Sequence, residues 1–166
     1  MTRMNRKMAD LLARTNIDLS GLDMFPMPTG NRDLVAVGDS VLFSEEFSRS
    51  GHVSLTSFEN VTGYECFVNH VHMECREERP SLLGALGFVA ALRKALEEFC
   101  DREVFSIIVS FSDDECTVRF HKQRQNEKWL ADDIDGYKSE SILEIWTRQR
   151  VGDSASQQVS ESASQH

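Results

Sequence analysis

The strongest constraint on the fold is a pair of alternating segments on either side of an acidic turn at 113–115. Before the turn, Phe105, Ile107, Val109 and Phe111 alternate with Ser106, Ile108 and Ser110; after it, Cys116, Val118 and Phe120 alternate with Thr117, Arg119 and His121. Successive side chains of a β-strand point to opposite faces of the sheet. The pattern therefore predicts an antiparallel hairpin with one strongly apolar face that another element must cover.

A helix predicted over 81–100 is the natural cover for that face. Its apolar residues recur at the three-and-four spacing of one buried helical stripe: Leu82, Ala85, Leu86, Val89, Leu92, Leu96 and Phe99. Pro80 suits the first turn of such a helix. Gly84 and Gly87 lower its helix propensity, and we expect their missing side chains to let strand backbone approach closely.

Further strands are predicted by alternation and by the turn residues between them, over 34–37, 41–43, 52–57, 64–73 and 141–148. The segment 129–136 has weak helical character that stops at Gly136. A cluster of strands, one long helix and then more strands is typical of an α+β protein. We predict a mainly antiparallel sheet of about six strands, with the one long helix packed on one face.

The chain divides into three parts by composition. Residues 1–32 are expected to be an N-terminal arm and linker, in which 1–16 forms either a short amphipathic helix or a frayed arm. Residues 33–150 are expected to form a single α+β domain. Residues 151–166 are polar and rich in Ser and Gln, and a segment that buries so little apolar surface is predicted to be a disordered tail.

The charge of the chain limits its partners. The formal net charge is −9 over 166 residues, and the excess of acidic side chains lies within 31–150. Such a chain is ill-suited to nucleic acid or anionic membrane surfaces, whereas a basic protein partner would be steered toward it. The four cysteines lack metal-binding or disulfide spacing, and no stretch reaches the length of a membrane span, so we expect a cytoplasmic protein with reduced thiols.

Three arrangements of residues raise the possibility of catalysis. A metal-dependent enzyme would use His70, His72 and Cys66, which share one face of the strand predicted over 64–73, with Cys75 and His121 nearby. A cysteine–histidine nucleophile and paired carboxylates in the acidic turns are weaker alternatives, because no local signature accompanies either. We expect no enzyme activity, no metal and no cofactor.

A protein-binding surface is the preferred interpretation. It comprises the acidic turn and the segment that follows the hairpin, and its candidate residues are Asp113, Asp114, Glu115, Arg124, Glu127, Trp129, Asp132, Asp133 and Asp135. Tryptophan is enriched among the residues that dominate interface energetics. The competing interpretation is that Trp129 belongs to the core and that the acids only solubilise the surface.

Three segments carry a resemblance to a known family. YECFVNHVHME (64–74), the following helix and ECTVRFHKQR..EKWLADDIDGY.SESILEI (115–145) resemble immunity protein family 10 of bacterial polymorphic toxin systems. Asn126 stands where we expect that family to have glycine before EKW, a mild departure because Asn also tolerates a left-handed backbone. The resemblance implies a cytoplasmic antidote that binds a cognate toxin protein and neutralises it by stoichiometric inhibition. The alternatives are an acidic secretion chaperone for an effector or the metal-dependent enzyme.

Overall fold

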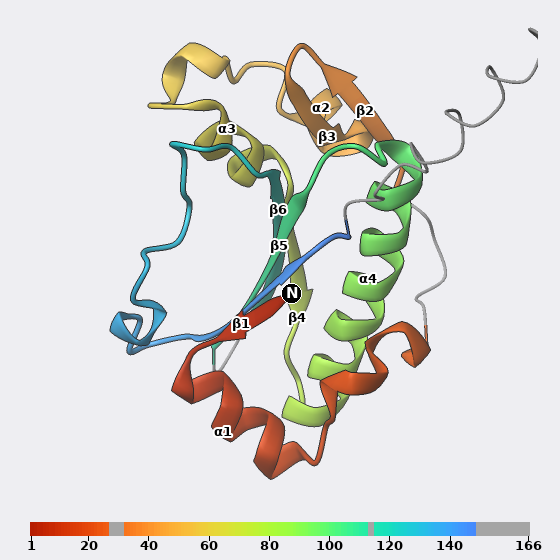
Figure 1. The fold of residues 1–166 in the computed structure, drawn as a ribbon, viewed down its shortest axis with the longest axis vertical. Coiled ribbons are helices and arrows are strands. Elements are labelled where there is room, and N and C mark those ends of the chain that lie inside the picture. The colour runs from red at the N-terminus through yellow and green to blue at the C-terminus, as the bar shows by residue number, and fades with distance from the viewer. Residues whose placement is uncertain (27–31, 113–114, 149–166) are drawn as a thin grey trace, which may run out of the picture.

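A computed structural model describes residues 1–26, 32–112 and 115–148 of the chain (Figure 1). Its main sheet has five strands in the order β1-β7-β5-β6-β4, and all neighbouring strands are antiparallel. The strands are β1 (Thr2–Met4), β4 (His70–Glu74), β5 (Phe105–Phe111), β6 (Glu115–Lys122) and β7 (Ser141–Trp146). The predicted α+β class is confirmed, with the strands divided between this sheet and a separate two-stranded sheet.

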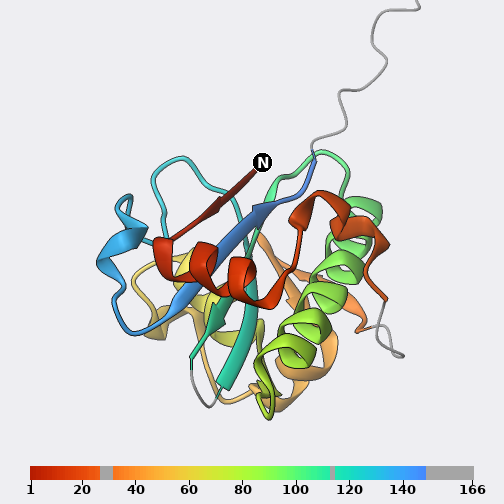
Figure 2. The same cartoon turned by 90° about the horizontal axis from the view of Figure 1, so that it is seen from below.

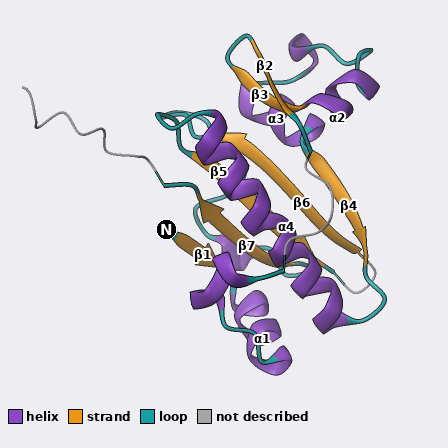
Figure 3. Ribbon diagram, turned by 90° about the vertical axis from the view of Figure 1, so that its right-hand side faces the viewer, coloured by secondary structure: helices purple, strands orange, loops and turns teal. Residues whose placement is uncertain are grey.

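The long helix α4 (Glu78–Phe99) covers one face of the main sheet, as predicted. Its Leu82, Leu86 and Leu96 are fully buried, as are Ile107, Val109 and Phe120 of the hairpin β5–β6. Figure 3 shows α4 in front of the strands of this sheet. The alternation that predicted the hairpin therefore arises because every second side chain meets the helix.

Gly84 does not have the role expected of it. No heavy atom lies within 4 Å of the position that a Cβ at Gly84 would occupy, so no strand backbone approaches the helix there. Gly84 instead leaves open space on the surface of α4.

The N-terminal residues differ from the expected arm, because they complete the sheet and its core. β1 pairs with β7 through Thr2↔Ile145, and it lies at one edge of the sheet. Helix α1 (Arg6–Thr15) follows, with Met8 and Leu11 fully buried. Asn5 begins this helix. Its Oδ1 accepts a hydrogen bond from Met8 N–H, and its backbone N–H donates to the carbonyl of Ile142 on β7. The helical alternative for 1–16 is thus confirmed over α1, which Figure 2 shows in front of the sheet edge.

Residues 17–68 form the connections and the smaller sheet. The 3₁₀ helix η1 (Leu19–Met24) packs on α4. β2 (Leu34–Val37) and β3 (Ser40–Phe43) form a hairpin, as predicted, with Gly38 at φ 60° in its turn. The strand predicted over 52–57 is wrong: α2 (Ser44–Arg49) precedes that stretch, and only the 3₁₀ helix η2 (Leu55–Ser57) forms within it.

The strand predicted over 64–73 is wrong in its first half. Residues Val61–Val68 form helix α3, and only His70–Glu74 is extended. Asn60 begins the helix, because its side chain accepts a hydrogen bond from Gly63 N–H at 2.8 Å. The sequence of α3 is rich in β-branched and aromatic residues, whose local preference for strand is overridden by packing against β3 and β6.

The segment between β6 and β7 covers part of the other face of the main sheet. We call residues 123–140 the covering segment; Figure 1 shows it on the side of the sheet opposite α4. Leu130 and Ile134 pack on Ile108 and Ile142 in a small core of their own. The helical character predicted over 129–136 is limited to the 3₁₀ helix η3 (Ile134–Gly136).

Two other sequence predictions concern the C-terminal tail and membrane-spanning segments. The tail predicted over 151–166 lies outside the described residues. Within the described ranges, no helix combines the length and the apolarity that crossing a membrane requires.

Candidate binding face of the sheet

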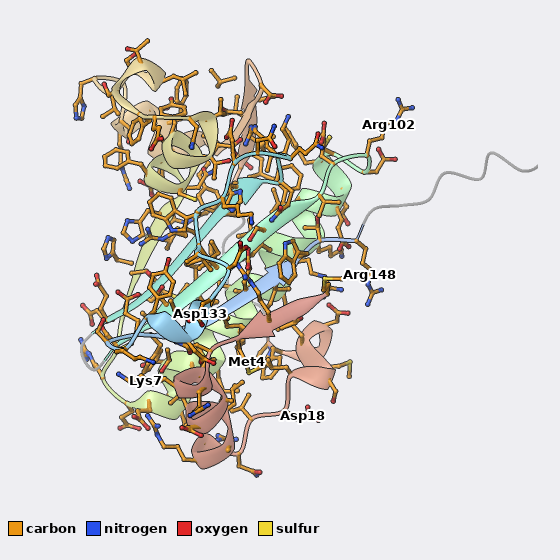
Figure 4. The ribbon with its side chains drawn as sticks, turned by 60° about the vertical axis from the view of Figure 1, so that its left-hand side comes forward. Met4, Lys7, Asp18, Arg102, Asp133 and Arg148 are labelled. Atoms are coloured by element: carbon orange, nitrogen blue, oxygen red, sulfur yellow. The ribbon has the colours of Figure 1, made fainter. Side chains whose placement is uncertain are left out.

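The face of the main sheet opposite α4 carries a row of polar side chains that crosses all five strands. The strand registers place Arg3 beside Glu144, Glu144 beside Ile108, Ile108 beside Arg119 and Arg119 beside His70. Ile108, the apolar member, lies under the covering segment. We call this surface the polar face, and Figure 4 shows it with its side chains.

Glu144 is a buried carboxylate at one end of this row, with 4% of its surface exposed. Arg3 donates from Nε to Glu144 Oε2 at 2.5 Å, and Ser106 donates from Oγ to Oε1 at 2.5 Å. Charged partners of this kind are needed to hold an ionised carboxylate away from water. The Arg3 guanidinium also lies 5.9 Å from the ring centroid of Trp146. Arg3 on β1 is therefore the cationic partner of Glu144 and also contacts Trp146.

Arg119 organises the other end of the row. It donates from Nη2 to His70 Nε2 at 3.0 Å, and its guanidinium lies 5.3 Å from the ring centroid of Trp129. Burial and the nearby Arg119 lower the pKa of His70 to about 4, so this imidazole is neutral near pH 7. His70 then accepts at Nε2 and carries its proton on Nδ1. Within the described residues, Arg119 Nε is a buried nitrogen without a hydrogen-bond partner.

A pocket of about 230 Å³ lies between the two tryptophans. Trp129 and Trp146 line it, together with His121 from the sheet and Asp132 from the covering segment. Burial lowers the pKa of His121, and its Nδ1 lies 3.0 Å from the carbonyl of Lys122. Because Trp129 remains 39% exposed, this pocket presents an aromatic wall at the protein surface.

The acidic residues predicted for the partner surface lie along the covering segment, but each has a local contact. Lys128 Nζ donates to Asp132 at 2.7 Å, and this contact lowers the pKa of Asp132. Asp133 accepts from Asp135 N–H, and Asp135 accepts from Arg6 N–H at 2.6 Å. All three carboxylates remain exposed. Figure 4 shows Asp133 near the start of α1, where Met4 and Lys7 are labelled.

Two residues predicted for the partner surface have structural contacts instead. Arg124 donates from Nη1 to Glu65 Oε2 at 2.8 Å and from Nη2 to Glu65 Oε1 at 3.1 Å. Glu127 accepts from Thr62 N–H at 2.9 Å, at the first turn of α3. Both side chains thus tie the covering segment to α3.

This connection between the two sheets is not among the predictions from sequence. Glu65 is fully buried and also accepts from the backbone N–H groups of Val41 and Lys122. One turn later, Asn69 accepts from Phe43 N–H and donates to the carbonyls of Val41 and Phe120. Glu65 and Asn69 are four residues apart, and this spacing places them on one face of a helix. A helix predicted over 61–68 would therefore have indicated that the two side chains act together.

The remaining predicted site residues lie apart from this network. Asp113 and Asp114 lie outside the described residues. Glu115 contacts His72 Nδ1 across β4 and β6. His70 and His72 share one side of β4, as predicted, with ring centroids 4.1 Å apart.

Cys66, the third candidate ligand of the metal-dependent alternative, does not share a strand face with His70 and His72. Cys66 is on α3 and fully buried, and burial raises the pKa of its thiol, so it is no neighbour of the two histidines along a strand. His70 Nε2 faces the cationic Arg119. Among the described residues, no group of three or more His, Cys, Asp or Glu side chains is arranged to hold a metal ion.

The fold and this site define an α+β protein with a helix on one face of its sheet and a polar, tryptophan-lined surface on the other. The chain belongs to the uncharacterized protein PM0498 family, whose sequence model matches residues 3–158. The match begins within β1 and includes all of α1, so the N-terminal helix falls within the family region. No curated protein and no solved structure matches the chain.

Proposed function

We propose that this chain is a cytoplasmic immunity protein that binds a cognate toxin domain and neutralises it by stoichiometric inhibition, without catalysis of its own. The observation that carries the proposal is Trp129, an exposed aromatic ring that Arg119 holds in place beside a pocket. Aromatic residues that are oriented before binding lose little conformational entropy when a partner covers them.

Charge supports a basic partner. Asp132, Asp133 and Asp135 are exposed on the same covering segment as Trp129. The chain as a whole carries a formal charge of −9. An aromatic centre with carboxylates around it resembles the usual anatomy of a protein interface, in which charged groups steer the encounter and a buried aromatic residue provides affinity.

The resemblance of 64–74 and 115–145 to immunity protein family 10 supports the same proposal. Those segments include β4, β6, the covering segment and most of β7. Together with the helix α4, the resemblance thus includes three of the five strands that build the polar face and the covering segment.

The test begins with the coding sequence directly upstream of this chain. Its C-terminal domain is produced in cells with and without this chain, and growth is measured. We expect growth arrest by that domain alone, rescue by the wild-type chain, and a one-to-one ratio of the two proteins in the purified complex. Toxicity that this chain leaves unchanged would contradict the proposal.

A further inference from the structure

Strand β4 has an edge that no other strand covers. Among the described residues, His70–Glu74 pairs with β6 on one side only, and Figure 3 shows β4 as the outermost strand of the sheet. The N–H and C=O groups on the free side of an edge strand are a template for another strand.

The five residues of β4 are complementary to themselves when read in the antiparallel direction. If His72 lies opposite His72 of a second copy, His70 lies opposite Glu74 and Val71 lies opposite Met73. Apolar residues then meet on the side of α4, and an imidazole meets a carboxylate on the polar face. Directly opposite pairs of these kinds stabilise antiparallel strands.

The hydrogen-bonding state of His70 fits this register. Its Nε2 accepts from Arg119, so the proton on Nδ1 remains available for an acceptor. Glu74 of a second copy would provide that acceptor. At the centre of the pairing, each His72 keeps its own contact with Glu115 of the same chain.

Space for the second copy exists beside this edge. A groove of about 510 Å³ lies between β4 and the first turns of α4, and Met73, Pro80, Ser81 and Gly84 are among its lining residues. The absent side chain at Gly84 keeps the groove open. A strand added to β4 would direct Val71 and Met73 of the second copy toward this groove, because alternate side chains of a strand point to the same face.

We propose that two copies of this chain associate through β4 in antiparallel orientation, with His72 on the two-fold axis, so that the two main sheets become continuous. A C2 interface requires a surface that complements itself, and the β4 register meets that requirement in both hydrogen bonding and apolar contact. This dimer does not depend on the function proposed above. A pairing of five residues buries little area, so the dimer should dissociate on dilution.

Analytical ultracentrifugation of the full chain tests the association. Between about 1 μM and about 1 mM, we expect the mean mass to rise from monomer to dimer. A Gly84→Leu variant should remain monomeric, because leucine fills the groove at an exposed helical position without disturbing the core. Lys94→Leu, ten residues along α4 on its exposed surface, adds the same apolar side chain away from the groove and should dimerise like the wild type. A monomeric wild type at every concentration would overturn the proposal, as would dimerisation of Gly84→Leu.

Cross-linking tests the register. In a Cys75→Ser, Cys100→Ser background, His72→Cys should form an intermolecular disulfide on mild oxidation, because opposite Cα atoms in an antiparallel pair lie about 5 Å apart. Glu74→Cys should not, because four residues of offset separate the two copies of that position by about 13 Å. Equal cross-linking of both variants would overturn the register and with it the proposed interface.

Discussion

Arg124 on the covering segment forms a two-pronged ion pair with Glu65, a carboxylate on α3 that is fully buried. The same arginine donates from Nε to Asp39 Oδ2 at 3.0 Å in the turn between β2 and β3. Lys122 also contacts Asp39, and these contacts lower the pKa of that carboxyl. One guanidinium therefore joins the smaller sheet, α3 and the main sheet.

Arg124→Met should destabilise the fold by about 3–5 kcal/mol, because it leaves Glu65 as a buried carboxylate without its cation. Urea unfolding followed by circular dichroism at pH 7 measures the loss. Arg49→Met is the matched control: Arg49 is 63% exposed and pairs with Glu45 and Glu46 on α2, so its loss should cost no more than about 1 kcal/mol. Equal effects of the two variants would show that the Glu65 pair contributes no more than a surface contact.

Trp129→Ala should change stability little. The ring is 39% exposed, and its contact with Arg119 is of the kind worth about 0.5–1 kcal/mol at exposed sites. Phe120→Ala is the comparison, because Phe120 is fully buried in the main core and its truncation should cost about 3–5 kcal/mol. Thermal unfolding of the two variants separates them. A loss for Trp129→Ala as large as that for Phe120→Ala would assign Trp129 to the core.

Reversing the charges at Asp132 and Asp133 should slow association with the toxin domain. Both residues are exposed, so the double variant Asp132→Lys, Asp133→Lys should fold, with a small loss from the contacts of Asp132 with Lys128 and of Asp133 with Asp135 N–H. Stopped-flow measurements should give a slower association rate at low salt, and the difference should shrink as salt screens the charges. The double variant Glu98→Lys, Asp101→Lys, at the end of α4, is the control, because it changes the net charge by the same amount at exposed positions away from the covering segment. A rate equal to that of the control would refute electrostatic steering by the covering segment.

The stability of the protein should fall as the pH is lowered from about 6.5 to about 4, in part because of His70. Burial and Arg119 hold the pKa of His70 at about 4, whereas the unfolded side chain titrates near 6.5. Between these values the unfolded chain binds more protons than the folded one, so the unfolding free energy rises with pH across this window. Since His70 is only partly buried, we expect the contribution to be roughly 1–2 kcal/mol after allowing for solvent screening.

Chemical unfolding at pH 7 and at pH 5 measures this effect, with His70→Asn as the control. Asparagine removes the titrating group while keeping a polar side chain next to Arg119. The wild type should lose more stability than His70→Asn between the two pH values. Identical losses would mean that the pKa of His70 is not lowered in the folded protein.

The features that could be predicted from sequence are those with strong periodicity. The hairpin β5–β6 and the helix α4 repeat their apolar residues over many positions, because each meets a large flat partner. Strand β1 could not be predicted: it has three residues, and its partner β7 is far away in the sequence. The strand predicted in place of α3 was wrong. The residues of α3 locally favour a strand, but the helix allows buried Glu65 and Asn69 to form hydrogen bonds with β3 and β6.

The binding face, like the fold, could be predicted from the sequence only in part. Sequence composition drew attention to Trp129 and the acids after it, and the structure brings these residues to an exposed segment. The alternation of the hairpin placed Arg119 and His121 on the face that proved polar, but their contacts with His70 and the pocket depend on strand order, which alternation does not specify. The separation of Arg124 from the other candidates likewise depends on α3.

The β4 dimer affects the comparison with a secretion chaperone. A dimeric state by itself would favour that alternative. A tight complex of one chain with one folded toxin domain would favour the immunity protein, so the composition of the complex separates the two.

Neutralisation by direct binding is tested most directly by isothermal titration calorimetry of the wild type and of Trp129→Ala with the purified, folded toxin domain encoded upstream. We expect one toxin domain bound per chain, and a loss of at least about 2 kcal/mol of binding free energy for Trp129→Ala, which is an affinity reduced about 30-fold or more. Absence of binding by the wild type, or equal affinity of the two proteins, would contradict the proposed function.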